Sequence, residues 1–140
     1  MTTERFTDYV LSEYENVTGR KLSDSERAAD RDSLVSGISE TDRKADVTRK
    51  FAAVILHRAM QRLSSEEDED WGIAKGFRDI YDCRVCANAI AQVAVKGIIA
   101  PARNELFGAM DTLPEAEAIG AVKRLWIPSQ RITKLLESYE

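Results

Sequence analysis

Two cysteines have the most obvious chemical potential, and they are spaced as Cys83-x-x-Cys86. This spacing suits a dithiol redox pair or half of a zinc site. A thioredoxin-type pair follows a strand in a βαβ setting, and zinc needs two more ligands, whereas the single histidine, His57, is far away in the sequence. Two half-buried thiols are therefore the interpretation we favour, ahead of a local disulfide and of metal or catalytic chemistry.

A run of five acidic residues, Glu66 to Asp70, stands directly before Trp71. Carboxylates in a loop bind calcium when they alternate as Asp-x-Asp-x-Asp-Gly, and this run lacks that alternation. The pattern predicts a solvated acidic linker over residues 64–70, or the first turn of a short helix.

The remaining sequence contains no Ser-His-Asp set, no phosphate-binding glycine loop and no carboxylate pair with a defined spacing. We therefore expect a protein that is not an enzyme, with no cofactor and no metal.

The helices that would position these residues are clearest in a unit from Phe77 to Trp126. Asp82 is a candidate N-cap, Gly97 is a candidate stop, and Thr112 to Glu115 has the S/T-x-x-E pattern of a capping box. Each of the two predicted helices has an apolar inner face: Val85, Cys86, Ala89, Ile90, Val93 and Ala94 on the first, and Ala118, Ala121, Val122, Leu125 and Trp126 on the second. The unit is a helix-loop-helix.

Further helices are predicted on both sides of this unit. Apolar spacing predicts an N-terminal helix over residues 3–18, and Ser23 to Glu26 is a second capping box. The strongest apolar stripe lies between Asp46 and Leu63. A final helix is expected over residues 128–139.

Composition limits the class of protein. The chain has 140 residues, 44% of them hydrophobic and 31% charged, with a net charge of -4. These values predict one all-α domain over residues 1–140, without a broad basic face for nucleic acid. No apolar stretch is long enough for a membrane span, and the amino terminus lacks the apolar core of a signal peptide. The chain is expected to be cytoplasmic, or a mature fragment of a protein at the cell surface or outside the cell.

An internal repeat connects the two halves of the chain. Asp46 to Arg49 align with Thr112 to Glu115, and Asp46 and Thr112 are both candidate N-caps. Gly37-Ile38 align with Gly97-Ile98. The first copy, residues 24–63, is partial and has a shorter loop. The expected architecture is a bundle of helix-loop-helix repeats.

The complete copy, residues 77–126, resembles the S-layer homology motif of bacterial cell-surface proteins. That motif opens with Phe-x-Asp-Val, reaches Ala-Ile and then Lys-Gly-Ile-Ile, has a loop Phe and ends with Ile-Thr-Arg-Ala-Glu. The matching residues here are Phe77, Asp79, Ile80, Ala89, Ile90, Lys96, Gly97, Ile98, Ile99, Phe107, Leu113, Ala116 and Glu117.

The resemblance implies a helical pseudo-trimer of three motifs, whose grooves bind secondary cell-wall polysaccharide through acidic substituents such as ketal-linked pyruvate. The motif arginine is one groove residue, and Arg49 occupies that position in the first copy. The second copy has Glu115 in place of arginine and Val85 in place of an aromatic residue. Ligand-binding candidates are Arg49, Lys50, Trp71 and His57.

Two of these candidates have a second interpretation. His57 lies on the polar side of its predicted helix, so it is either a surface residue or a groove contact. Trp71 belongs either to the edge of the core or to a surface that stacks on a ligand or partner.

Two functions are consistent with these observations. The first is a non-catalytic anchoring or glycan-binding module that binds acidic cell-wall polysaccharide. The alternative is a helical interaction or structural module that keeps the fold without binding sugar, where a protein partner or self-association replaces the glycan.

Overall fold

Six α-helices form the framework of the computed structural model, which describes residues 1–132. No strand occurs among these residues, so the all-α class predicted from the sequence is confirmed. Short helical elements of other types lie outside these helices: a π turn over Met60–Ser64, and 3-10 turns over Gly72–Gly76, Arg84–Cys86 and Pro128–Gln130. The α-helices are α1 (Thr3–Thr18), α2 (Asp24–Leu34), α3 (Glu40–Lys44), α4 (Arg49–Ala59), α5 (Ala87–Val95) and α6 (Glu115–Trp126).

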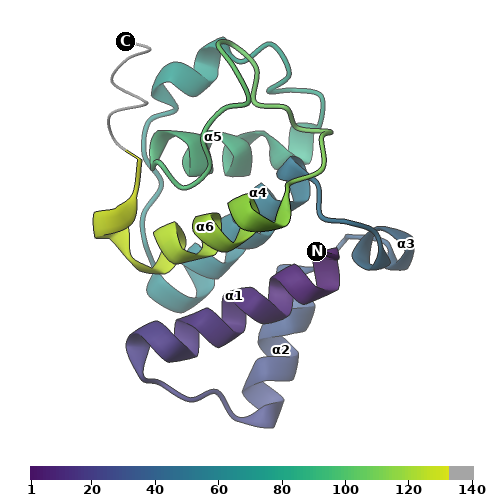
Figure 1. The fold of residues 1–140 in the computed structure, drawn as a ribbon, viewed down its shortest axis with the longest axis vertical. Helices are drawn as coiled ribbons and strands as arrows, with labels where there is room; N and C mark the ends of the chain where they lie inside the picture. Colours follow the sequence, from purple (N-terminus) through teal and green to yellow (C-terminus); the bar gives the residue numbers. More distant parts are fainter. Residues whose placement is uncertain (133–140) are drawn as a thin grey trace.

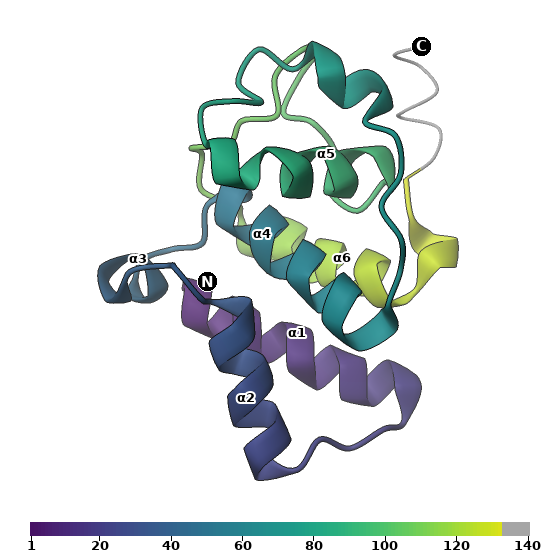
Figure 2. The ribbon, with the colours of Figure 1, turned by 180° about the vertical axis from the view of Figure 1, so that it is seen from behind.

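Helix α4 lies at the centre and contacts α1, α2, α5 and α6 (Figures 1 and 2). Most of its predicted apolar stripe is fully buried, whereas Leu63, the last residue of the stripe, is only partly buried. The α-helix ends at Ala59 rather than at Leu63, because the chain widens into one π turn over Met60–Ser64. Ser65 then takes a left-handed conformation with φ 53°, which ends the helix.

Three helices, α1, α4 and α6, begin at one small cluster of extended backbone. The N–H of Val47 donates to Met1 O at 3.0 Å, and the carbonyl of Val47 accepts from Leu113 N at 2.9 Å. The extended segments of this cluster also meet at the isolated bridges Thr2–Asp46 and Thr48–Thr112. The starts of three helices from distant parts of the sequence are thus fixed together.

This cluster corrects the predicted N-caps of α4 and α6. Asp46 and Thr112 lie in the extended bridges, and the helices start two residues later, after Thr48 and Pro114. The Thr48 hydroxyl accepts from Phe51 N at 3.3 Å, whereas Pro114 makes no side-chain cap. Local capping rules assign Asp46 and Thr112 to the helices as N-caps, but pairing between distant segments holds both residues in extended backbone.

The chain before α5 also differs from its prediction. Asp82 does not cap the helix; its N–H donates to Asp79 O at 3.0 Å inside a series of turns. A 3-10 turn over Arg84–Cys86 leads into α5 at Ala87. Val85, predicted to face inwards, is 93% exposed, while the other five residues of that predicted face are buried.

Helix α3 is a further element that periodicity did not predict. It has five residues and no buried side chain, and Ser39 caps it by accepting from Asp42 N at 3.1 Å. Its position beyond the body of the molecule is visible in Figure 1. A helix without an apolar face leaves no hydrophobic periodicity to detect.

The segment after α6 turns back onto the end of α5. Pro128–Gln130 form a 3-10 turn, and Ile132 N then donates to Gly97 O at 2.9 Å. Gly97 has φ +71°, and a Cβ atom there would lie 2.4 Å from the carbonyl oxygen of Ile132. The predicted helix over residues 128–139 thus begins as a 3-10 turn, and residues 133–140 lie outside the described part of the chain.

Candidate functional site: a groove beside Arg49

Arg49 is the first residue of α4, and its side chain enters the loop between α5 and α6. Its Nε donates to Phe107 O at 2.8 Å, and its Nη2 donates to Ala100 O. The guanidinium carbon also lies 4.8 Å from the centre of the Phe107 ring. Only 7% of the side chain is exposed. Arg49 therefore holds the loop in place before it binds any ligand.

Asp79 fixes the other side of the same loop. Its carboxylate accepts from three consecutive backbone N–H groups, those of Phe107, Gly108 and Ala109, each at 2.9 Å. Burial raises the pKa of Asp79, but these hydrogen bonds favour the charged form and lower the pKa below its usual value. The loop is rigidly held between an arginine and an aspartate.

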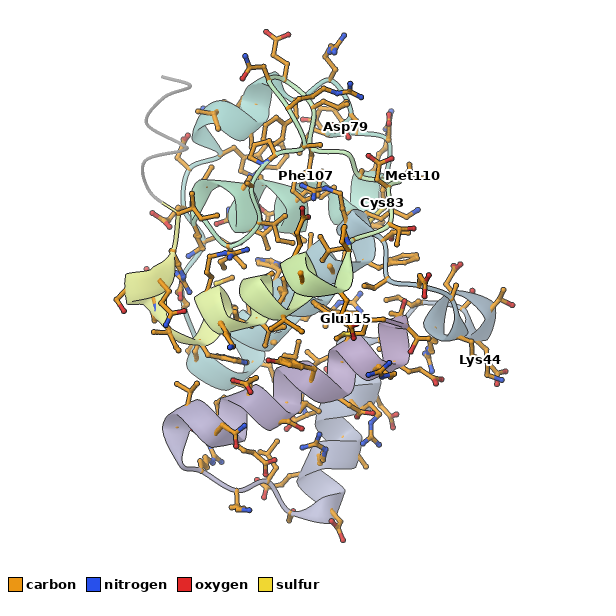
Figure 3. All side chains as sticks on the ribbon, in the orientation of Figure 1. Lys44, Asp79, Cys83, Phe107, Met110 and Glu115 are labelled. Atoms are coloured by element: carbon orange, nitrogen blue, oxygen red, sulfur yellow. A yellow bond between two sulfur atoms is a disulfide. The ribbon has the colours of Figure 1, made fainter. Side chains whose placement is uncertain are left out.

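A cavity of about 300 Å³ opens between this loop and α6. Its charged lining residues are Arg49, Arg124 and Glu117. Its apolar walls include Ile99, Pro101 and Ile132. We call this cavity the Arg49 groove; Figure 3 labels Phe107, in the loop that Arg49 holds, and Glu115 at the start of α6.

The charges in the Arg49 groove are unequally solvated. Glu117 lies 3.4 Å from Arg49 Nη1 and its side chain is 58% exposed. Desolvation lowers the pKa of both Arg49 and Arg124, while the Glu117 charge acts in the opposite direction on both. Arg49 and Arg124 are therefore partly desolvated cations that share the exposed carboxylate of Glu117, and the charges of Asp111 and Asp79 also act on Arg49.

The other three candidates do not line the Arg49 groove. Lys50 is half-buried, with its Nζ 4.8 Å from the Phe51 ring centre. Trp71 is half-buried, and its indole N–H donates to Asn88 Oδ1 at 2.9 Å, which fits the core-edge interpretation. His57, predicted to be either a surface residue or a groove contact, is instead buried, with its Nε2 2.8 Å from Asp68 Oδ1.

The acidic run is not a free linker, because polar side chains of α5 bind it. Gln92 exchanges two hydrogen bonds of 2.8 Å with the backbone of Glu69. Lys96 Nζ, which is almost completely buried, lies 2.7 Å from Glu66 Oε2. Glu66 also accepts two hydrogen bonds from Arg131, and these lower its pKa to about 2. The run is a strap, Glu66–Asp70, that connects α5 to the segment after α6.

The two cysteines form a disulfide, Cys83–Cys86, with their Cα atoms 5.2 Å apart. The favoured prediction of two thiols is therefore wrong, and the alternative of a local disulfide is correct. The pair lies apart from the Arg49 groove, at the start of the helical segment that contains α5.

A second cavity, of about 480 Å³, lies on the other side of the loop. Gly72 and Gly76 form one wall, and Arg103, Asn104 and Glu105 form the opposite rim. The polar rim is exposed, so its charges are already well solvated. The smaller Arg49 groove is the stronger candidate because its cations are desolvated.

Arg124 is the site residue that sequence reasoning missed. It is seven residues after Glu117 on α6, which places both side chains on one face of that helix. Its Nε donates to Ile98 O at 2.8 Å, so it also bridges α6 and the end of α5. The seven-residue spacing could have placed Arg124 on the same face of α6 as Glu117. The sequence does not indicate how deeply the guanidinium group of Arg124 is buried.

The comparisons with protein-family models, curated proteins and solved structures give no match for this chain. Within residues 1–132, no helix is long and apolar enough to cross a membrane. The same residues contain no group of three or more His, Cys, Asp or Glu side chains arranged to hold a metal ion.

Proposed function

We propose that this chain is a non-catalytic binding module of S-layer homology type, whose Arg49 groove takes an acidic sugar of a cell-wall polysaccharide. The observation that carries this proposal is the pair of partly desolvated arginines, Arg49 and Arg124, that line the groove with Glu117 as its one lining carboxylate. A ligand carboxylate would receive charge-assisted hydrogen bonds there, and apolar walls would contact the sugar ring.

The arrangement of the helices supports the fold part of the proposal. Family members combine three helix-loop-helix motifs, and here three helices, α1, α4 and α6, start from one extended cluster. Gly37 and Gly97, which the repeat alignment pairs, both have positive φ and both precede a buried isoleucine.

Energetics favour weak binding that gains strength from repetition. Two charge-assisted contacts of about 1.5–3 kcal/mol each give roughly 3–6 kcal/mol, and millimolar affinity needs about 4 kcal/mol. Glu117 reduces this gain because it competes for Arg49. A wall polysaccharide repeats its sugars along one chain, so several bound modules would give useful avidity.

A substitution of Glu117 tests the acidic-sugar site most directly, because the Glu117 carboxylate competes with the ligand for Arg49. Glu117→Gln removes the competing carboxylate without removing a cation, so affinity for pyruvylated wall polysaccharide should rise about fivefold, as expected for about 1 kcal/mol. Arg124→Gln should lower the affinity about tenfold. Isothermal titration calorimetry would measure both, with the polysaccharide before and after acid removal of its pyruvate.

Lys123→Gln is the matched control, because it removes one positive charge from an exposed neighbour of Arg124 on α6. Its affinity should stay within about twofold of the wild type. Equal binding of the pyruvylated and the depyruvylated polymer would exclude an acidic-sugar groove. A wild-type protein that does not bind at millimolar sugar would exclude the glycan function as a whole.

The alternative, a helical protein-interaction module without a sugar site, is supported by a different observation. Tyr81, Val85 and Met110 are large apolar side chains that are each more than 60% exposed. Recovery of a defined partner in a pull-down, or self-association in light scattering, together with no response to the polysaccharide, would favour this function.

A further inference from the structure

The Cys83–Cys86 disulfide occupies the N-terminus of a continuous helical segment. Cys83 precedes the 3-10 turn Arg84–Cys86, which runs directly into the nine residues of α5. The two residues differ in burial, because Cys83 is half-buried whereas Cys86 is only 2% exposed. Cys83 is therefore the residue of the pair that a substrate can approach from solvent.

We infer that this disulfide is redox-active and oxidises an exposed dithiol in a polypeptide substrate. A thiolate at a helix N-terminus is stabilised by the free backbone N–H groups and by the helix dipole. Cys83 has this position, so its sulfur is a favourable leaving group at the end of the exchange. The inference is independent of the Arg49 groove and adds a chemical activity to the proposed binding function.

The surroundings of Cys83 fit a polypeptide rather than a small thiol. Val85, between the two cysteines, is 93% exposed, and Tyr81 is 64% exposed. Tyr81 and Arg84 line a shallow cavity of about 340 Å³. Met110 is also exposed, and it follows Ala109, whose N–H donates to Asp79. Figure 3 shows Met110 and Cys83 along one edge of the molecule. Exposed apolar side chains around an accessible disulfide form a contact surface for an extended chain.

The exchange has two steps, and its electrons balance. A substrate thiolate attacks Cys83 Sγ, the Sγ–Sγ bond to Cys86 breaks, and Cys86 leaves as a thiolate that takes a proton from water. The second substrate thiol loses its proton to water, and its sulfur attacks the substrate sulfur of the mixed disulfide. Cys83 then leaves as a thiolate. The substrate dithiol loses two electrons, and the Cys83–Cys86 disulfide gains them.

The test uses the full chain and a reduced synthetic peptide with two cysteines separated by leucine and phenylalanine. Mass spectrometry would follow transfer of the disulfide from the protein to the peptide. The reference is an oxidised peptide with the sequence of residues 82–87, which has the same ring of atoms but no helix. We expect the folded protein to react at least tenfold faster than this reference. An equal or slower rate would overturn the inference.

Two variants test the parts of the argument. Val85→Ser changes only an exposed side chain, and should slow the reaction with the peptide about fivefold, for a loss of about 1 kcal/mol of apolar contact, without changing the rate with glutathione. Cys86→Ser, mixed with the same peptide in its disulfide form, should form a mixed disulfide on Cys83, because the remaining Cys83 thiolate attacks the peptide disulfide and one peptide sulfur leaves as a thiolate. Because this buried substitution can affect folding, rapid acid quenching of the wild type would locate the attacked sulfur independently. Attack at Cys86, or an equal loss of both rates in Val85→Ser, would contradict the assignment.

Discussion

Arg49 donates its Nε–H to the carbonyl oxygen of Phe107, 58 residues later in the chain, at a distance of 2.8 Å. The same guanidinium lies over the Phe107 ring. The two residues lie in the two segments, 24–63 and 77–126, that the sequence alignment pairs as copies of a predicted repeat. A residue that the family resemblance assigns to ligand binding thus also joins the copies, and the two roles must be separated by experiment.

Arg49→Met keeps the length of the side chain but removes its hydrogen-bond donors. The carbonyl groups of Phe107 and Ala100 would lose their arginine partner, so the free energy of unfolding should fall by about 3 kcal/mol. Urea denaturation followed by circular dichroism would measure the change. Lys123→Met, at an exposed position, should stay within about 0.5 kcal/mol of the wild type. Equal effects of the two variants would show that the Arg49 hydrogen bonds do not stabilise the fold.

Asp79→Asn keeps the shape of the side chain and replaces one acceptor oxygen by an NH2 group. That group would face backbone N–H donors of the loop 107–109, so we expect a loss of about 2–3 kcal/mol. Amide hydrogen exchange should accelerate first at Phe107, Gly108 and Ala109. The exposed control is Asp82→Asn, which should leave those amides protected; similar exchange in both variants would argue against the clamp.

Gly97→Ala tests how closely the segment after α6 approaches α5. Both Gly97 and Gly37 have positive φ, so alanine costs about 1 kcal/mol at either position. Only at Gly97 would the new Cβ meet other atoms, the backbone of Ile132 at 2.4 Å. Gly97→Ala should therefore destabilise the protein by about 2 kcal/mol more than Gly37→Ala in thermal or urea unfolding. Equal losses would mean that Ile132 is not held there.

The pH dependence of stability should include a contribution from Glu66. Hydrogen bonds from Arg131, and further contacts with Lys96, lower its pKa from 4.5 to about 2 in the folded chain. This stabilisation is fully present above pH 4.5 and is lost as the pH falls towards 2, because only the unfolded chain binds the proton within that window.

Glu66→Gln isolates this contribution. The variant should be less stable than the wild type by on the order of 2 kcal/mol at pH 7, and the difference should shrink as the pH approaches 2. Glu67→Gln, at an exposed neighbouring position, is the control and should show neither effect. A difference that stays constant from pH 7 to pH 3 would contradict the role assigned to Glu66.

Local chemistry determines three features of the fold: its helical class, the two ends of α1 and the capping box of α2. The sequence alone is therefore enough to predict them. The Thr2 hydroxyl accepts from Arg5 N, Gly19 ends α1 at φ 74°, and Ser23 and Glu26 exchange the two hydrogen bonds of a capping box. These interactions involve residues at most four apart, and their energies depend little on the rest of the chain.

Contacts between distant residues decided the rest. Asp46 and Thr112 are good N-caps by type, but pairing with Thr2 and Thr48 draws them into extended backbone. His57 faces the polar side of α4 by periodicity, yet it is buried because the acidic strap brings Asp68 to it. Arg49 could be assigned to a groove from its aligned position, but its second groove cation, Arg124, could not. Periodicity gives the face of a helix that a side chain occupies, whereas its neighbours are set only when the helices pack.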